Sequence, residues 1–315
     1  MLKYKSMNIQ TENLPNAEIK LIVTLENSKV REIHDKVVAK LVANSEIKGF
    51  RKGKAPAEEV LKNADFSKIE GETVSELLKT YYPGIVKEKG IFPYSNPKID
   101  LKEFAIDKDF KFEATIALKP EYKIADYKKI VADLRKEIDK ENAKIEKEIE
   151  KGNEKDSSTE NSEETKEVSK KRELTAEEVI NKIIEKSEFT ISELIVNEET
   201  DRLLERFINQ IKGLNLNVDQ LLKAQNKSYD DLLADHKLIA TNNIKSEFIL
   251  NQIVKDNSLE ASETEVDEFI KNLGDEKLIA QFSNPAEKWY IKGIIEKNKS
   301  LDYLKDLGKE EKNEK

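Results

Sequence analysis

The first 120 residues of the chain carry two hydrophobic rhythms. Apolar side chains occupy every second position over residues 19–25, and this period of two predicts a β-strand. Over residues 30–42 the apolar side chains recur on one helical face, and a second helical pattern covers residues 66–89. Alternation returns over residues 99–104 and 110–118, so this part of the chain is predicted to be an α+β domain.

The pattern changes beyond residue 134. Lys, Glu, Asp, Ser, Thr and Asn dominate residues 134–173, and large apolar residues almost vanish after Ile149. Such a segment cannot bury enough apolar surface to offset the entropy lost on folding. We therefore expect residues 151–169 to be disordered and residues 135–150 to form at most a charged single helix with little to bury.

Helical patterns return at residue 174 and continue to the end of the chain. Polar residues that suit a helix N-cap precede each apolar run: Thr175, Asn197, Asn217, Ser228, Ser262 and Asn284. Thr175 and Ser262 each have a glutamate three residues later, which is the spacing of a capping box. This half of the chain is predicted to be all-α.

These patterns divide the chain into three regions and make it mostly helical overall. Residues 1–122 are predicted to form the α+β domain. Residues 123–173 are a charged, partly disordered linker, and residues 174–315 are an elongated all-α domain. The length of 315 residues agrees with about two folded domains.

Composition narrows the classes of function. Charged residues make up 37% of the chain, which favours long amphipathic helices with one solvated face. The net charge of −8 argues against a generally basic nucleic-acid binder, so an anionic partner would have to meet a local basic patch. With no cysteine, the chain has no disulfide, zinc thiolate site or cysteine nucleophile. Residues 1–7 lack a secretory signal and no long apolar run occurs, so we expect a cytoplasmic protein that makes no membrane contact.

One local basic patch lies in a glycine-bracketed loop at residues 48–56, which reads Lys-Gly-Phe-Arg-Lys-Gly-Lys-Ala-Pro. Its two glycines permit backbone turns that other residues resist. Phe50 offers an apolar anchor, and Arg51 can grip a phosphate or a carboxylate with two hydrogen bonds. The loop lacks the spacing of a phosphate-binding loop. Taken alone, a short loop of this composition is most often a solvated turn.

The loop with its flanks resembles the ribosome-binding domain of bacterial trigger factor. That family carries Gly-Phe-Arg-Lys-Gly-Lys-x-Pro between two helices, and the matching residues are Gly49, Phe50, Arg51, Lys52, Gly53, Lys54 and Pro56. The preceding strand and helix agree, as does the Lys-Pro-Glu-Tyr step at residues 119–122. The C-terminal helices resemble the family's arm-forming substrate-binding domain in helix order alone. Together the resemblance covers about residues 7–130 and 175–307.

The resemblance implies an ATP-independent holdase that docks beside the ribosomal exit site through Phe50, Arg51 and Lys52. Its partners would be ribosomal protein and RNA near the exit tunnel and nascent polypeptides, with no cofactor. A homodimer off the ribosome is left open. Apolar residues of the helical half are candidates either for client contact or for interhelical core, and the aromatic ones are Phe207, Phe248, Phe269, Phe282 and Trp289.

Most trigger factors also carry a prolyl-isomerase domain of the FKBP type between these two regions. Here the short charged segment between residues 122 and 174 leaves no room for it, so the resemblance implies chaperone activity without isomerase activity. His34 and His236 lie far apart on predicted helices, and no cluster with metal-ligand spacing stands out. We therefore predict no catalytic residue and no metal site.

Three other readings stay open at this point. One is a peptide-binding chaperone of the periplasmic type that does not bind ribosomes. Another is a peptidyl-prolyl isomerase with an unrecognised site. The third is a helical scaffold without clients.

Overall fold

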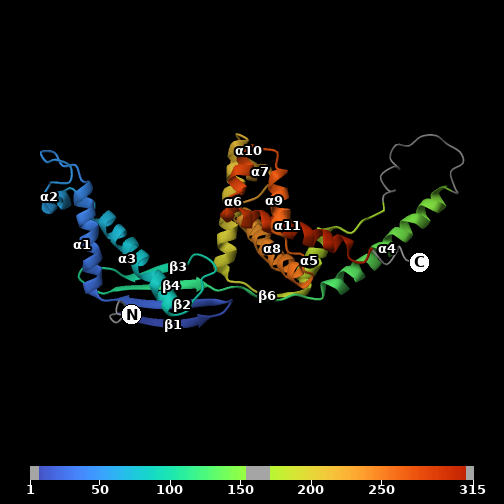
Figure 1. Ribbon diagram of the computed structural model, residues 1–315, viewed down its shortest axis with the longest axis horizontal. Helices are drawn as coiled ribbons and strands as arrows, with labels where there is room; N and C mark the ends of the chain where they lie inside the picture. The colour runs from blue at the N-terminus through green and yellow to red at the C-terminus, as the bar shows by residue number, and fades with distance from the viewer. Residues whose placement is uncertain (1–6, 154–170, 310–315) are drawn as a thin grey trace. The chain divides into compact units, whose positions relative to one another are not determined.

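The computed structural model describes residues 7–153 and 171–309 (Figure 1). The segment expected to be disordered, residues 151–169, lies outside the described residues except for 151–153, which end a helix. The chain forms two compact units. Unit 1 combines Met1–Glu121 with Thr190–Lys237, and unit 2 combines Tyr122–Phe189 with Leu238–Lys315.

Unit 1 contains a four-stranded antiparallel sheet in the order β1-β2-β4-β3. Its strands are β1 (Met7–Leu14), β2 (Glu18–Leu25), β3 (Lys98–Glu103) and β4 (Phe110–Ala117). Strands β2, β3 and β4 confirm the predicted alternation. β1 lies outside the predicted strands because it is an edge strand whose side chains are mostly polar and at least partly exposed.

Two helices cover one face of this sheet, and a short one follows the first (Figure 1). They are α1 (Asn27–Asn44), α3 (Phe66–Glu88) and the short α2 (Ala57–Lys62). The core between sheet and helices contains fully buried side chains such as Leu21, Leu77 and Phe110. The Asn27 side-chain amide fixes the start of α1 by donating to the Ile106 carbonyl oxygen at 2.7 Å.

Unit 1 also contains α6 (Glu193–Gly213), α7 (Val218–Ala224) and the first part of α8 (Tyr229–Asp256). The Ser192 hydroxyl caps α6 by accepting from the Leu194 N–H, and it donates to the Glu18 carboxylate of β2 at 2.7 Å. The prediction that Asn197 caps this helix is therefore wrong, and Asn197 lies inside α6. Ser192 takes the role because the buried stripe of α6 already begins at Ile195.

Unit 2 is helical apart from most of the short ribbon made by β5 (Glu121–Lys123) and β6 (Glu188–Thr190). Its helices, besides the rest of α8, are α4 (Tyr127–Asn153), α5 (Ala176–Lys186), α9 (Glu263–Lys271), α10 (Glu276–Phe282) and α11 (Pro285–Asp306). Tyr127 and Val131 of α4 are buried against α5, α8 and α11. Ile138 is also buried, so residues 135–150 bury more than expected. The short α10 begins after Asp275, which is not among the N-cap residues predicted from the sequence.

The predicted capping boxes at Thr175 and Ser262 are both present. Hydrogen bonds from the Thr175 N–H and from Arg172 lower the pKa of Glu178 to about 2. Asn284 caps α11 as predicted, and Pro285 occupies the first position of this helix. Within residues 7–153 and 171–309, no helix combines the length and apolar composition that crossing a membrane requires.

Candidate functional site

Residues 48–56, called the basic loop from here on, lie in the connection between α1, which ends at Asn44, and α2, which begins at Ala57. Three backbone hydrogen bonds shape the segment. The Phe50 N–H donates to the Ile47 carbonyl oxygen at 3.0 Å, and the Lys54 N–H donates to that of Arg51 at 2.9 Å. The third joins the Gly53 N–H to the Ser45 carbonyl oxygen at 3.0 Å. The loop is thus folded into turns that return to the end of α1.

Both glycines of the basic loop have left-handed backbone conformations, with φ of +95° at Gly49 and +69° at Gly53. Their surroundings differ. A β-carbon at Gly49 would meet nothing within 4 Å, whereas one at Gly53 would stand 2.5 Å from the Ala43 carbonyl oxygen. Glycine is therefore required at Gly53 by space as well as by backbone conformation. This close approach fixes the loop against α1.

The tip of the basic loop presents one apolar and several cationic side chains to solvent. Phe50 is 45% exposed, although a large apolar side chain gains free energy from burial. The basic side chains around it are all exposed: Lys48, Arg51, Lys52 and Lys54. Lys52 lies 3.2 Å from Glu46, and such a surface ion pair holds a charge only weakly. The structure therefore gathers the predicted residues on one accessible loop.

The two ends of the basic loop differ in exposure. Ala55 is buried and anchors the loop before α2. Pro56 is exposed and serves as the N-cap residue of α2, which begins at Ala57.

The five aromatic candidates of the helical half differ widely in exposure. Trp289 is 79% exposed and Phe269 is 36% exposed, whereas Phe248 is only 7% exposed. The Phe248 ring packs 5.0 Å from the Tyr122 ring and is a core residue. Phe207 is half-buried with its ring 5.2 Å from that of His236. The half-buried Phe282 stacks on Tyr290 at 6.4 Å.

Further exposed apolar residues were not singled out by the sequence. In unit 2 they include Leu278 on α10 and Tyr290 on α11. In unit 1 they gather where α6, α7 and α8 follow one another: Leu214, Leu216, Tyr229 and Leu233. The leucines in the turn after Gly213 lie outside any helical stripe, and this position indicates from the sequence that they are exposed. Exposure within a regular stripe has no such signal.

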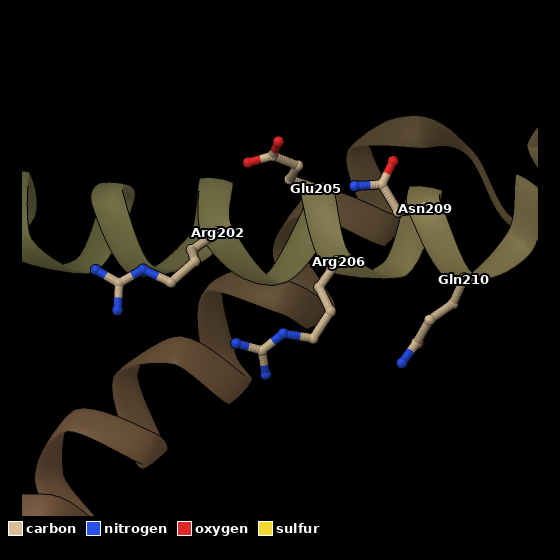
Figure 2. Close-up of a pocket in the computed structure, with 5 residues that line it drawn as sticks. All are labelled: Arg202, Glu205, Arg206, Asn209 and Gln210. Atoms are coloured by element: carbon tan, nitrogen blue, oxygen red, sulfur yellow. The ribbon is translucent and has the colours of Figure 1, made fainter. Parts of the chain in front are cut away.

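A surface hollow of about 510 Å³ on α6 is lined by polar side chains (Figure 2). Arg202, Arg206 and Gln210 extend to one side of the helix, and Glu205 and Asn209 extend to the other. Arg202 pairs with Glu199 on the same helix at 3.1 Å. Because these groups diverge, the hollow does not assemble an acid, a base and a nucleophile around one point.

The titratable groups outside the loop form no catalytic arrangement in the described part of the chain. His34 lies 3.5 Å from its neighbour Asp35, and the His236 ring is hydrogen-bonded to the Leu232 carbonyl oxygen one helical turn earlier. Burial raises the pKa of Tyr82 to about 12, so its hydroxyl stays protonated in the core. Across residues 7–153 and 171–309, no three His, Cys, Asp or Glu side chains are placed to hold a metal ion.

Comparison with known proteins yields two family matches that together span nearly the whole chain. Residues 7–152 match the family model of bacterial trigger factor protein (TF), and residues 152–313 match that of the bacterial trigger factor protein (TF) C-terminus. The two matches meet at residue 152, so they leave no intervening stretch for an isomerase domain.

Curated relatives match over a shorter part of the chain. The trigger factor of Staphylococcus carnosus is 34% identical over 123 residues, which are 39% of this chain and 27% of that protein. The trigger factor of Clostridium tetani is 33% identical over 141 residues, or 43% of this chain and 32% of that protein. The matched region thus spans less than a third of the length of these relatives.

The fold has a counterpart among solved structures. It comes from a study of promiscuous substrate recognition in the folding and assembly activities of the trigger factor chaperone. The similarity has a TM-score of 0.59 and covers 95% of this chain and 99% of the other, at 13% sequence identity. At that identity the likeness concerns the fold alone.

Proposed function

Because this chain belongs to the bacterial trigger factor family, we propose that it is an ATP-independent chaperone that docks at the ribosome and shields nascent polypeptides. The observation that carries the proposal is the basic loop. Its apolar tip residue, Phe50, is exposed among four exposed cations in a protein whose net charge is −8. The loop thus places one apolar ring among concentrated positive charge, which matches a partner surface that is anionic around an apolar spot.

The chemistry of the tip fits a ribosomal surface. RNA phosphates and acidic protein side chains both accept charge-assisted hydrogen bonds, and Arg51 can grip either with two of them. Phe50 would bury its ring in an apolar contact between these charges. A few exposed ionic contacts give affinity that is modest and salt-sensitive, and this suits a chaperone that cycles on and off the ribosome.

The exposed apolar residues of the helical regions are the proposed client contacts. Trp289, Phe269 and Tyr290 in unit 2 offer aromatic surface, and Leu214 and Leu233 in unit 1 offer aliphatic surface. Burial of apolar surface stabilises a complex by about 25 cal/mol per Å². Several small contacts with an unfolded chain can therefore add up to a useful binding free energy. Phe248 is not included because it is buried.

We further propose that the protein lacks prolyl-isomerase activity, works in the cytoplasm and needs no cofactor. The junction of the two family matches at residue 152 supports the first of these statements. A homodimer off the ribosome is compatible with the exposed apolar residues, and analytical ultracentrifugation of the free protein tests it.

An aggregation assay tests the chaperone function. A chemically unfolded client protein is diluted into buffer without ATP, and light scattering is followed with and without this protein. We expect scattering to fall as the protein approaches the client concentration, and no catalysis in a proline-peptide isomerisation assay run in parallel. Unchanged scattering at excess protein would overturn the chaperone proposal, and clear catalysis would overturn the statement about isomerisation.

A further inference from the structure

A groove of about 550 Å³ lies beside the basic loop, between α1 and α2. Figure 1 shows α2 next to the end of α1, where the groove is formed. Its lining is mostly small and apolar: Val38, Ala39, Val42, Ala43, Gly53 and Ala57. The charged residues of the basic loop do not line this groove. The ionic contacts proposed for the loop therefore do not explain what the groove binds.

The walls of the groove are open to a partner. Ala39 and Ala43 are both exposed and lie four residues apart on α1, which places them on one face of the helix. Ala57 is exposed on α2 and lines the same groove. Side chains this small leave room for a bulky apolar side chain to lie between the two helices.

The charge of the groove selects the class of partner. Its lining contains no lysine or arginine, and its polar side chains are His34 and Asp35, with the His34 Nδ1 3.5 Å from the Asp35 Oδ1. A phosphate would find no lysine or arginine there, and the Asp35 carboxylate beside His34 would repel it. An apolar side chain, with a basic or hydrogen-bond-donating neighbour facing Asp35, matches the groove. The lining therefore favours a protein segment over RNA.

We infer that this groove receives an apolar side chain from a ribosomal protein while the basic loop makes the ionic contacts. Gly53 joins the two surfaces because it lines the groove and belongs to the loop. One docking event would then cover both. The inference rests on the proposed function and adds to it a second contact surface and the kind of residue that occupies it.

Groove-filling substitutions test this inference in the full-length chain. Ala39→Trp and Ala57→Trp each place a large side chain in the groove from opposite walls. Ala132→Trp on α4 is the matched control, since Ala132 is an exposed helical alanine outside the groove. In ribosome co-sedimentation we expect both groove variants to bind about tenfold more weakly than wild type and the control to bind like wild type. Circular dichroism checks that all three variants are folded.

The outcomes separate the inference from the proposed function. If wild type fails to sediment with ribosomes, both are overturned. If Phe50→Ala with Arg51→Ala and Lys52→Ala abolishes binding but both groove variants bind like wild type, docking through the loop stands and the groove inference is overturned.

A photo-crosslinking amino acid at position 39 identifies the occupant directly. Irradiated with purified ribosomes, it should yield a protease-sensitive adduct to a ribosomal protein, and the same probe at position 132 should not. Crosslinks to RNA alone would contradict the inference.

Discussion

Gly53 and Ala43 approach each other so closely that a β-carbon on Gly53 would stand 2.5 Å from the Ala43 carbonyl oxygen. This contact, with the hydrogen bond from the Gly53 N–H to Ser45, holds the basic loop against the end of α1. The position of the loop tip therefore depends on the absence of a β-carbon at Gly53.

Gly53→Ala is expected to disturb the loop more than Gly49→Ala. Both substitutions put alanine in a left-handed conformation, at a cost of about 1–2 kcal/mol each. Only the first also forces backbone atoms apart, because the space around Gly49 is open. Amide hydrogen exchange at Phe50 and Lys54 measures the local opening, and it should accelerate clearly more in Gly53→Ala. Equal acceleration in the two variants would show that the contact with Ala43 does not hold the loop.

Alanine substitutions at Trp289 and Phe248 should separate effects on client binding from effects on stability. Phe248→Ala removes a buried ring and is expected to lower the free energy of unfolding by about 3–5 kcal/mol. Trp289→Ala removes an exposed ring, so stability should stay within about 0.5 kcal/mol. It should nevertheless weaken protection of an aggregating client. Denaturant unfolding and light scattering measure the two effects, and a Trp289→Ala variant that protects as well as wild type argues against a client role for this residue.

The salt dependence of ribosome binding should report the partner of Arg51. If its guanidinium contacts RNA phosphate, Arg51→Gln reduces the slope of log K against log salt by about 0.7–0.9. Lys223→Gln on α7 in unit 1 is the control and should leave the slope unchanged. Sedimentation at several salt concentrations gives both slopes. If the slope stays constant while affinity falls, Arg51 does not act through phosphate.

The capping box of α5 should make stability depend on pH. The pKa of Glu178 is lowered to about 2 from an unfolded value near 4.5, so the folded state prefers the ionised carboxylate. The resulting stabilisation is complete above pH 4.5 and is lost as the pH falls toward 2. Unfolding free energies of wild type and Glu178→Gln should therefore differ at pH 6 and converge near pH 2. Glu177→Gln, an exposed neighbour, serves as the control, and a difference independent of pH would exclude this linkage.

Thr175→Ala removes the other half of the same capping box. Loss of an N-cap hydroxyl is expected to cost about 1 kcal/mol of stability at neutral pH. Because the Glu178 N–H donates to the Thr175 hydroxyl at 3.2 Å, this loss should persist at low pH, unlike that of Glu178→Gln. Denaturant unfolding at both pH values distinguishes the two halves.

Helix caps and strands that bury one face could be predicted from the sequence of this chain. The capping boxes at Thr175 and Ser262 follow from a hydroxyl and a glutamate three residues apart, and both form. The alternation in β2 and β4 survives because both strands bury one face against α1 and α3. These features depend on neighbours within a few residues, or on one buried face, and sequence periodicity reports both.

The features that hydrophobic periodicity did not predict depend on tertiary contacts. Phe248 and Trp289 occupy similar helical patterns, yet one is core and the other surface. Phe248 packs against Tyr122 of β5, whereas on α11 it is Ile291, not Trp289, that is buried against α9. The edge strand β1 has too few apolar residues to be recognised. The groove arises from α1 and α2 packing side by side, which neither helix encodes alone.

Ribosome co-sedimentation of a loop variant tests docking most directly. The combined Phe50→Ala, Arg51→Ala and Lys52→Ala variant is compared with wild type at low and moderate salt. The control replaces another exposed set of one phenylalanine and two basic residues in the same unit: Lys87→Ala, Lys89→Ala and Phe92→Ala. We predict that wild type and the control pellet with ribosomes and that the loop variant stays in the supernatant. Equal pelleting of the loop variant and wild type would contradict docking through the basic loop.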